Sequence, residues 1–313
     1  MLGHRFQLDK RTHRTLWIPF VFNSFNRDNL DLVAIPHSYH EPEVDDKHYY
    51  FAGTNAWWVS HILSDSDLVT VFSEIKNTQL QVVRVWGFGS VNTDPGPGSV
   101  FFQLLNSTGS YINYAANGIP RLDAVVSMAE QTGLKIVLNF VNNVGPLVRP
   151  FALQLADVLQ WSDLGGIASY NAAFGGNATS WYTDSQSQSV YKDYIKLLVN
   201  RYHRGQRLTF LCARTNRDAT AAHDQVGAAA NKPVVLEEYG YGSPNNHTAV
   251  ERPWQLTVLD DTSLAMDQFW QFGTTDLSGG LSDYDTNTIW YNSTAEYDVL
   301  AREHAAEMLE KAV

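Results

Sequence analysis

Short apolar segments alternate with amphipathic segments from about residue 48 onward, and this alternation limits the possible folds more than any other feature of the chain. Each apolar segment has the length of a buried strand and ends in polar or aromatic residues. Each following segment carries apolar residues at helical spacing. Such alternation is typical of a parallel α/β fold. The predicted order is strand (49–58), helix (64–80), strand (81–88), helix (118–134) and strand (135–143).

The same pattern returns in the C-terminal half of the chain. It predicts a helix over 189–202, strands over 234–240 and 266–273, and a closing helix over 296–313. Ser64 or Asp65 is expected to cap the helix over 64–80, and Gly133 to end the helix over 118–134. An α/β barrel of about 250 residues folds as one domain, so the length does not require two domains, and in a closed parallel barrel the active site lies where the strands end.

Two stretches interrupt this pattern. Val144 to Gln160 stands between two regular segments, contains two prolines and has neither helical nor strand rhythm. Residues 203–221 follow a good helix where a strand is due, but this stretch is basic and has no pattern. We expect the first stretch to protrude as a poorly packed insertion.

Composition excludes several classes of function. The net charge of −11 argues against nucleic acid as a partner, because phosphate binding requires a surplus of Lys and Arg. The single cysteine, Cys212, excludes a disulfide framework and a Cys-rich metal site. No stretch reaches the length of about 18 apolar residues expected of a membrane helix. The 9 Trp, 15 Tyr and 15 Phe residues suit either a well-packed core or a carbohydrate-binding surface.

Two adjacent carboxylates, Glu237 and Glu238, end the apolar strand in "VVLEEYG". Strand alternation places their side chains on opposite faces, so one of them faces the strand end. Arg84 lies inside the apolar strand "VVRVW", where an unpaired cation would cost several kcal/mol, and it is the expected partner. The pair is either a structural ion pair or a catalytic carboxylate that the arginine holds ionised. A carboxylate that simply meets solvent at the strand end is a third interpretation.

Five tryptophans fall at strand ends or in the loops beyond them, where they are either core residues or platforms for a ligand: Trp58, Trp86, Trp161, Trp270 and Trp290.

Several segments together carry a resemblance to a known family. In order along most of residues 48–202 and 222–313, the chain resembles the secreted fungal endo-β-1,4-mannanases of glycoside hydrolase family 5. The long block over residues 101–143 makes the resemblance specific, whereas "EEYG" alone would not. The segments that carry it are "YYFAGTNAWW", "VVRVWGFGSVNTDPGPG", "FFQLLNSTGSYINYAANGIPRLDAVVSMAEQTGLKIVLNFVNN", "WSDLGGIASYNAAFGGNATSWYTDSQSQSVYKDYIKLLVNRY", "NKPVVLEEYG", "MDQFWQFG" and "TIWYN".

The resemblance implies a (β/α)8 TIM barrel that cleaves β-mannan with retention of configuration. Compared with the family, strands 4 to 6 are missing or scrambled in this chain, so an incomplete barrel is expected. A faulty gene model or a decayed gene would explain both irregular stretches. It implies that Glu238 is the nucleophile, that Arg84 supports it, and that Trp58, Asn142 and Trp270 bind substrate. No cofactor, metal, nucleic acid or membrane is implied, and the expected protein is a secreted monomer. The expected organisation is an unmatched N-terminal extension over residues 1–47 and a catalytic domain over residues 48–313.

A retaining glycosidase also needs a protonated carboxyl group about 5–5.5 Å from the nucleophile. The family supplies it from an Asn-Glu-Pro motif after the fourth strand, and no such motif follows Tyr202 here. The only Glu-Pro pair, Glu41 with Pro42, precedes the first barrel strand and is interpreted as a decoy. The general acid is therefore not found. The open alternatives are an impaired mannanase, another β-glycanase of the family, a non-catalytic mannan binder and a non-functional product.

Overall fold

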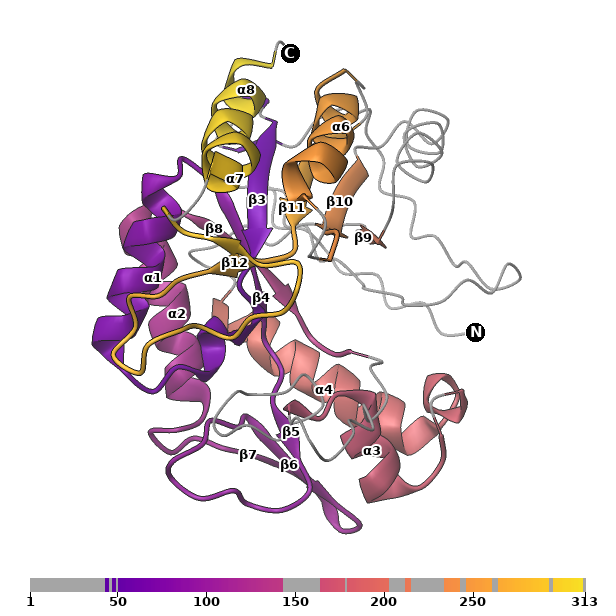
Figure 1. Cartoon of the computed structure of the whole chain (residues 1–313). Coiled ribbons are helices and arrows are strands. Elements are labelled where there is room, and N and C mark those ends of the chain that lie inside the picture. The colour runs from indigo at the N-terminus through magenta and orange to yellow at the C-terminus, as the bar shows by residue number, and fades with distance from the viewer. Residues whose placement is uncertain are drawn as a thin grey trace, which may run out of the picture.

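Six parallel strands form one curled sheet that organises the molecule (Figure 1). The fold is known from a computed structural model, which describes residues 43–44, 47–48, 50–142, 164–177, 179–202, 212–214, 234–242, 246–260, 264–292 and 295–311. The strands lie in the order β8 (Lys135–Asn139), β4 (Val82–Trp86), β3 (Phe51–Asn55), β11 (Leu264–Phe269), β10 (Val234–Tyr239) and β9 (Cys212–Arg214).

Helices follow these strands and cover the outer face of the sheet, as the alternation predicts. In Figure 1, α1 (Asp65–Asn77) lies beside α2 (Ile119–Thr132), and α6 (His247–Asp260) lies near α8 (His304–Glu310). The Ser64 hydroxyl caps α1 by accepting the backbone N–H of Asp67, and Gly133 ends α2 in the left-handed conformation. Both predicted helix boundaries are confirmed.

The remaining described elements complete this frame. The helix α4 (Ser185–Tyr202) is preceded by α3 (Ile167–Phe174) and the 3₁₀ turn η4 (Ser180–Tyr182). The closing helix runs through α7 (Ala295–Tyr297), the π-helical turn η5 (Asp298–Glu303) and α8. Another 3₁₀ turn, η1 (Trp57–His61), follows β3. The short strands are β1 (Glu43–Val44), β2 (Lys47–His48), β5 (Ser90–Val91), β6 (Gln103–Asn106), β7 (Gly109–Ile112), β12 (Phe272–Gly273) and β13 (Ile289–Trp290).

Side chains on the inner face of the sheet lie in successive layers, because every second residue of a strand points the same way. The first layer is an apolar cluster, Phe51, Val82, Val137, Val235 and Met266. Two residues further along the strands, the layer becomes polar and contains Arg84, Asn139, Glu237 and Gln268, all buried. The layer after that holds Asn55, Trp86 and Trp270. Polar and aromatic groups therefore gather at the carboxyl ends of the strands, where barrels of this type have their active sites.

The sheet is an incomplete (β/α)8 barrel. Among the described strands, β8 and β9 pair on one side only, so this sheet does not close on itself. One expectation is wrong in detail: residues 203–221 lack a strand pattern, yet Cys212–Arg214 pair in parallel with β10. A strand of three residues is too short for hydrophobic periodicity to indicate it, and the pairing depends on the neighbouring strand rather than on its own sequence.

Several sequence-based expectations lie outside the described residues. They include the protruding insertion Val144 to Gln160, the decoy Glu41, and Trp161. The division into an extension over 1–47 and a catalytic domain over 48–313 stays a prediction. Within the described helices, none is long and apolar enough to cross a membrane.

A buried histidine–aspartate contact holds the closing helix to the sheet. Nε2 of His304 on α8 lies 2.7 and 2.9 Å from the two carboxylate oxygens of Asp267 on β11, and both side chains are 1% exposed. We expect His304→Ala to lower the free energy of unfolding by about 3–5 kcal/mol, because it leaves a buried carboxylate without its partner.

Urea unfolding of the purified protein measures this effect. Arg302→Ala is the matched control, since Arg302 pairs with Asp298 on the same helical segment but both are exposed. That change should cost at most about 1 kcal/mol. Equal and small losses in the two variants would contradict the account of the buried contact.

Candidate active site

The guanidinium of Arg84 lies at the centre of the polar layer and contacts both carboxylates of β10. Its Nε lies 2.7 Å from Oε1 of Glu237, and its Nη1 lies 3.3 Å from Oε2 of Glu238. The same Nη1 donates to Oδ1 of Asn55 at 2.7 Å. These side chains are buried or nearly so, and a buried cation requires such partners. The predicted pairing of Arg84 with the strand-end carboxylates is therefore confirmed.

The expectation that Glu237 and Glu238 face opposite sides is wrong, because both side chains reach the same guanidinium. The physical reason is an irregularity in β10. Its pairing with β9 shifts register between Leu236 and Glu238, and its pairing with β11 shifts between Leu236 and Tyr239. Such a bulge re-aims a side chain near a strand end and is common beside active sites. Glu237 is the more buried of the two, and Glu238 is the more accessible.

The backbone after Glu238 is held close to Trp270. The N–H of Trp270 donates to the carbonyl of Tyr239 at 2.6 Å. A Cβ placed on Gly240 would lie only 2.5 Å from the carbonyl oxygen of Trp270. The glycine of the "EEYG" motif is thus required by the close approach of two backbone segments. This packing brings the ends of β10 and β11 together at the candidate site.

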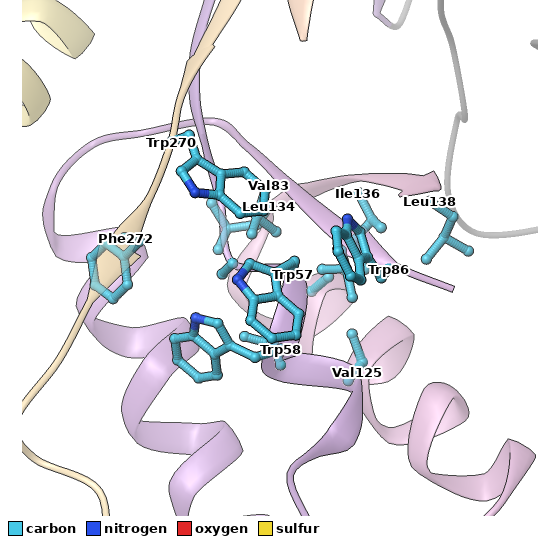
Figure 2. Close-up of a cluster of buried hydrophobic side chains, with 14 of the residues drawn as sticks. Trp57, Trp58, Val83, Trp86, Val125, Leu134, Ile136, Leu138, Trp270 and Phe272 are labelled. Carbon is cyan, nitrogen blue, oxygen red and sulfur yellow. The ribbon is translucent and has the colours of Figure 1, made fainter. Parts of the chain in front are cut away.

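Tryptophans that follow or end three strands form a ring cluster (Figure 2). Trp57 stacks on Trp270 with centroids 6.5 Å apart and planes at 4°, and Trp86 lies 4.8 Å from Trp57 and 6.2 Å from Trp270. Trp58 is labelled beside them in Figure 2 and is 2% exposed, while Trp270 is 6% exposed. Both predicted platform residues therefore lie buried at the site end of the sheet, and their contact with substrate stays a prediction.

The indole of Trp270 has a fixed polar partner. Its Nε1–H donates to Oδ2 of Asp285 at 2.8 Å. Oδ1 of Asp285 accepts the backbone N–H of Asn287 at 2.8 Å, so the carboxylate is held within its own turn. Asp285 was not found by sequence reasoning, because nothing in the "SDYDTN" stretch distinguishes it from an ordinary turn residue.

Asn142, the third predicted substrate contact, lies just beyond β8 and is 6% exposed. Among the described residues, neither polar atom of its side chain has a hydrogen-bond partner. Gly166 packs against it so closely that a Cβ there would lie 2.0 Å from Oδ1 of Asn142. A buried amide without partners is costly to maintain. Its role toward substrate stays a prediction.

Glu251 supports the loop that follows the candidate nucleophile. It is fully buried on α6, and its Oε1 accepts the backbone N–H of Tyr241 at 2.9 Å. Burial raises the pKa of Glu251 to about 8; the hydrogen bond from Tyr241 opposes this shift and the charge of Glu296 adds to it.

This raised pKa predicts a pH dependence of stability. Between pH 4.5 and about 8 the folded protein keeps the Glu251 proton while the unfolded chain loses it. The free energy of unfolding contributed by this group therefore falls as pH rises through that window, by up to about 1.4 kcal/mol per pH unit. Urea unfolding from pH 5 to 7.5 should show a shallower fall for Glu251→Gln than for the unsubstituted chain. Glu74, whose pKa burial raises to about 7, contributes equally to both proteins, so identical slopes would contradict the prediction.

The amino-acid sequence of this chain is similar to those of known mannanases over most of its length. Mannan endo-1,4-beta-mannosidase A of Hypocrea jecorina is 33% identical over 346 residues, covering 83% of this chain and 75% of that protein. The protein of the same name from Aspergillus aculeatus is 31% identical and covers 84% of this chain and 87% of that protein. The chain belongs to the fungal endo-1,4-β-mannosidases of glycoside hydrolase family 5. No family model matches it.

Solved structures of the mannanase family show the same fold. The endo-1,4-beta-mannanase of Rhizomucor miehei superposes with a TM-score of 0.68 at 22% identity, covering 86% of this chain and 97% of that one. A family 5 mannosidase from the same organism superposes with a TM-score of 0.62 at 11% identity, covering 87% of this chain and 96% of that one. The 346-residue match to the Hypocrea jecorina protein exceeds the 313 residues of this mannosidase-family chain. That relative therefore contains residues within the matched region that have no counterpart here, and the assignment of the gap to strands 4 to 6 stays a prediction.

Proposed function

We propose that this chain is a retaining endo-β-1,4-mannanase whose turnover on mannan is impaired. The observation that carries the proposal is the Arg84 guanidinium, which contacts Glu237 and Glu238 where the parallel strands end. Family membership supplies the substrate class, since the relatives are named for mannan. In this reading the substrate is a β-mannan outside the cell, and the protein acts as a secreted monomer.

Glu238 performs the first step. One of its carboxylate oxygens forms a bond to the anomeric carbon, and the bond from that carbon to the glycosidic oxygen breaks. Water then attacks the same carbon, loses a proton to the solvent because the residue that would act as base is missing, and releases the carboxylate, which restores the original configuration. Arg84 keeps Glu238 oriented through the 3.3 Å contact. Trp58, Asn142 and Trp270 hold the sugar, and Trp270 lies under the ring that is cleaved.

The expected impairment of mannan cleavage arises when the leaving group departs. The departing sugar oxygen requires a proton, and the Asn-Glu-Pro motif that carries the family's acid does not follow Tyr202 in the sequence. A general acid contributes about 10²–10⁴ in rate, so mannan cleavage is expected to be slower by that factor. Glu237 does not replace the acid, because its carboxylate is buried against Nε of Arg84.

The test compares the purified chain on soluble β-mannan and on a soluble cellulose derivative. Slow release of reducing ends from mannan, with the β-anomer formed first by NMR, is the expected result. Faster cleavage of the cellulose derivative would identify another β-glycanase. Binding to immobilised mannan without cleavage would identify a non-catalytic binder, and the absence of a cooperative thermal transition would identify a non-functional product.

A further inference from the structure

Asn55 makes polar contacts with Arg84 and with the backbone beside Glu238, and none of the roles assigned above explains these contacts. It ends β3 and is fully buried. Its Oδ1 accepts Nη1 of Arg84 at 2.7 Å, and its Nδ2 donates to the backbone carbonyls of Glu237 at 3.1 Å and Phe269 at 3.2 Å. This network fixes the orientation of the amide, because a guanidinium only donates and a carbonyl only accepts.

One of these hydrogen bonds crosses the inside of the sheet. In the strand order β3 and β10 are not neighbours, since β11 lies between them. Asn55 nevertheless reaches the carbonyl of Glu237, which belongs to the peptide group that precedes Glu238. The register of β10 shifts at this point, so regular strand pairing does not fix the backbone there. The side chain of Asn55 supplies a constraint that the irregular pairing lacks.

The hydrogen bond between Asn55 and Arg84 fixes the position of the guanidinium. Nη1 of Arg84 is shared between Oδ1 of Asn55 at 2.7 Å and Oε2 of Glu238 at 3.3 Å. The shorter contact is with Asn55, so the asparagine determines where this nitrogen lies relative to the Glu238 carboxylate. The same side chain thus holds the backbone before Glu238 and the arginine beside it.

We propose that Asn55 is a positioning residue for the nucleophile: it aligns the Glu238 carboxylate by holding Arg84 and the carbonyl of Glu237. This role rests on the proposed function, in which Glu238 attacks the anomeric carbon. Asn55 itself does not touch the reacting atoms. Without it, Nη1 of Arg84 loses its 2.7 Å partner and the carbonyl of Glu237 loses its donor, while the contact of Arg84 with Glu237 remains. A displacement of about 1 Å at a reacting group can cost about 10² in rate.

The experiment uses 2,4-dinitrophenyl β-mannobioside, whose leaving group departs as a stable anion and requires no general acid. The burst of dinitrophenolate in the first turnover reports attack by the nucleophile alone, because later turnovers also require hydrolysis of the glycosyl-enzyme, in which the missing acid would serve as base. Asn55→Ala should lower the maximal burst rate by about 10² while the substrate concentration that gives half of it changes less than threefold. Asn139→Ala is the matched control, because Asn139 is also a buried strand-end asparagine but donates to neither Arg84 nor Glu237 in the described contacts. It should keep the rate within threefold.

A double-mutant comparison with Arg84→Lys distinguishes a positioning role of Asn55 from a general loss of stability. In an Arg84→Lys background, Asn55→Ala should cost less than tenfold, because the arginine that it holds is already gone. If Asn55→Ala does not melt cooperatively, Asn55→Ser is measured by the same criteria. An unchanged rate in the folded variant, an equal loss in Asn139→Ala, or full additivity with Arg84→Lys would overturn the positioning role. A lack of release by the unsubstituted chain would instead overturn the proposed function, and with it this inference.

Discussion

Glu238→Gln should abolish dinitrophenolate release from an activated aryl β-mannobioside, lowering the rate by about 10³-fold or more. The reason is that an amide cannot supply the electron pair of a carboxylate to the anomeric carbon. Glutamine keeps the volume of the side chain and leaves Arg84 with its contacts to Asn55 and Glu237. The folded structure should therefore survive, and thermal unfolding of the variant verifies this.

Glu237→Gln is the matched control, because the two glutamates are adjacent and share the same arginine. It removes one charge from the buried cluster and should cost tenfold at most, estimated roughly from misplacement of Glu238. If Glu237→Gln abolished release while Glu238→Gln did not, the roles of the two residues would be reversed and the irregular end of β10 would have been misinterpreted.

Restoring the family's segment for strands four to six should raise turnover on soluble mannan by at least about 10²–10⁴ over the present chain. The restored acid protonates the sugar oxygen that otherwise leaves as a poor anion. A closed barrel would also hold Arg84 and Trp270 more firmly, and misplacement by about 1 Å can cost another 10². The measurement is the initial rate of reducing-end release by both proteins under the same conditions.

The aryl mannobioside is the internal control for this comparison. Because its leaving group requires no proton, the restored protein should gain less in first-turnover release of dinitrophenolate than in turnover of mannan. Equal turnover of the two proteins on mannan would show that the present chain contains an acid that we have not recognised. An equal gain on both substrates would assign the defect to geometry rather than to the missing acid.

Sequence alone predicts the part of the fold in which local pattern and tertiary structure agree. The strands β3, β4 and β8 and the helices α1 and α2 follow from hydrophobic periodicity, and Ser64 and Gly133 mark the helix ends by known capping chemistry. Arg84 is predictable as a paired group because an apolar strand cannot contain an unpaired cation. These features depend on neighbouring residues along the chain or on apolar surroundings, and both can be inferred from the sequence itself.

Other features depend on contacts between distant segments and leave no local pattern. The bulge that turns Glu237 and Glu238 toward one guanidinium arises from pairing with two neighbouring strands. The short strand β9 forms only beside β10. Asn55 is a polar residue that ends a buried strand, but it carries no charge that would require a partner, and its partners come from residues about 30 to 215 positions away. Asn55 and its partners meet only when the chain folds, so their spacing in the sequence does not reveal the contacts.

The most direct test of the central claim is to identify the residue that becomes covalently bound to the sugar. A 2-deoxy-2-fluoro analogue of the dinitrophenyl mannobioside slows hydrolysis of the glycosyl-enzyme more than its formation, so the intermediate accumulates. Proteolysis and tandem mass spectrometry of the labelled chain then locate the sugar. We expect one equivalent of sugar on Glu238, within the peptide that contains "VVLEEYG". A sugar on Glu237 or on any other carboxylate, or release of dinitrophenolate with no adduct at all, would contradict it.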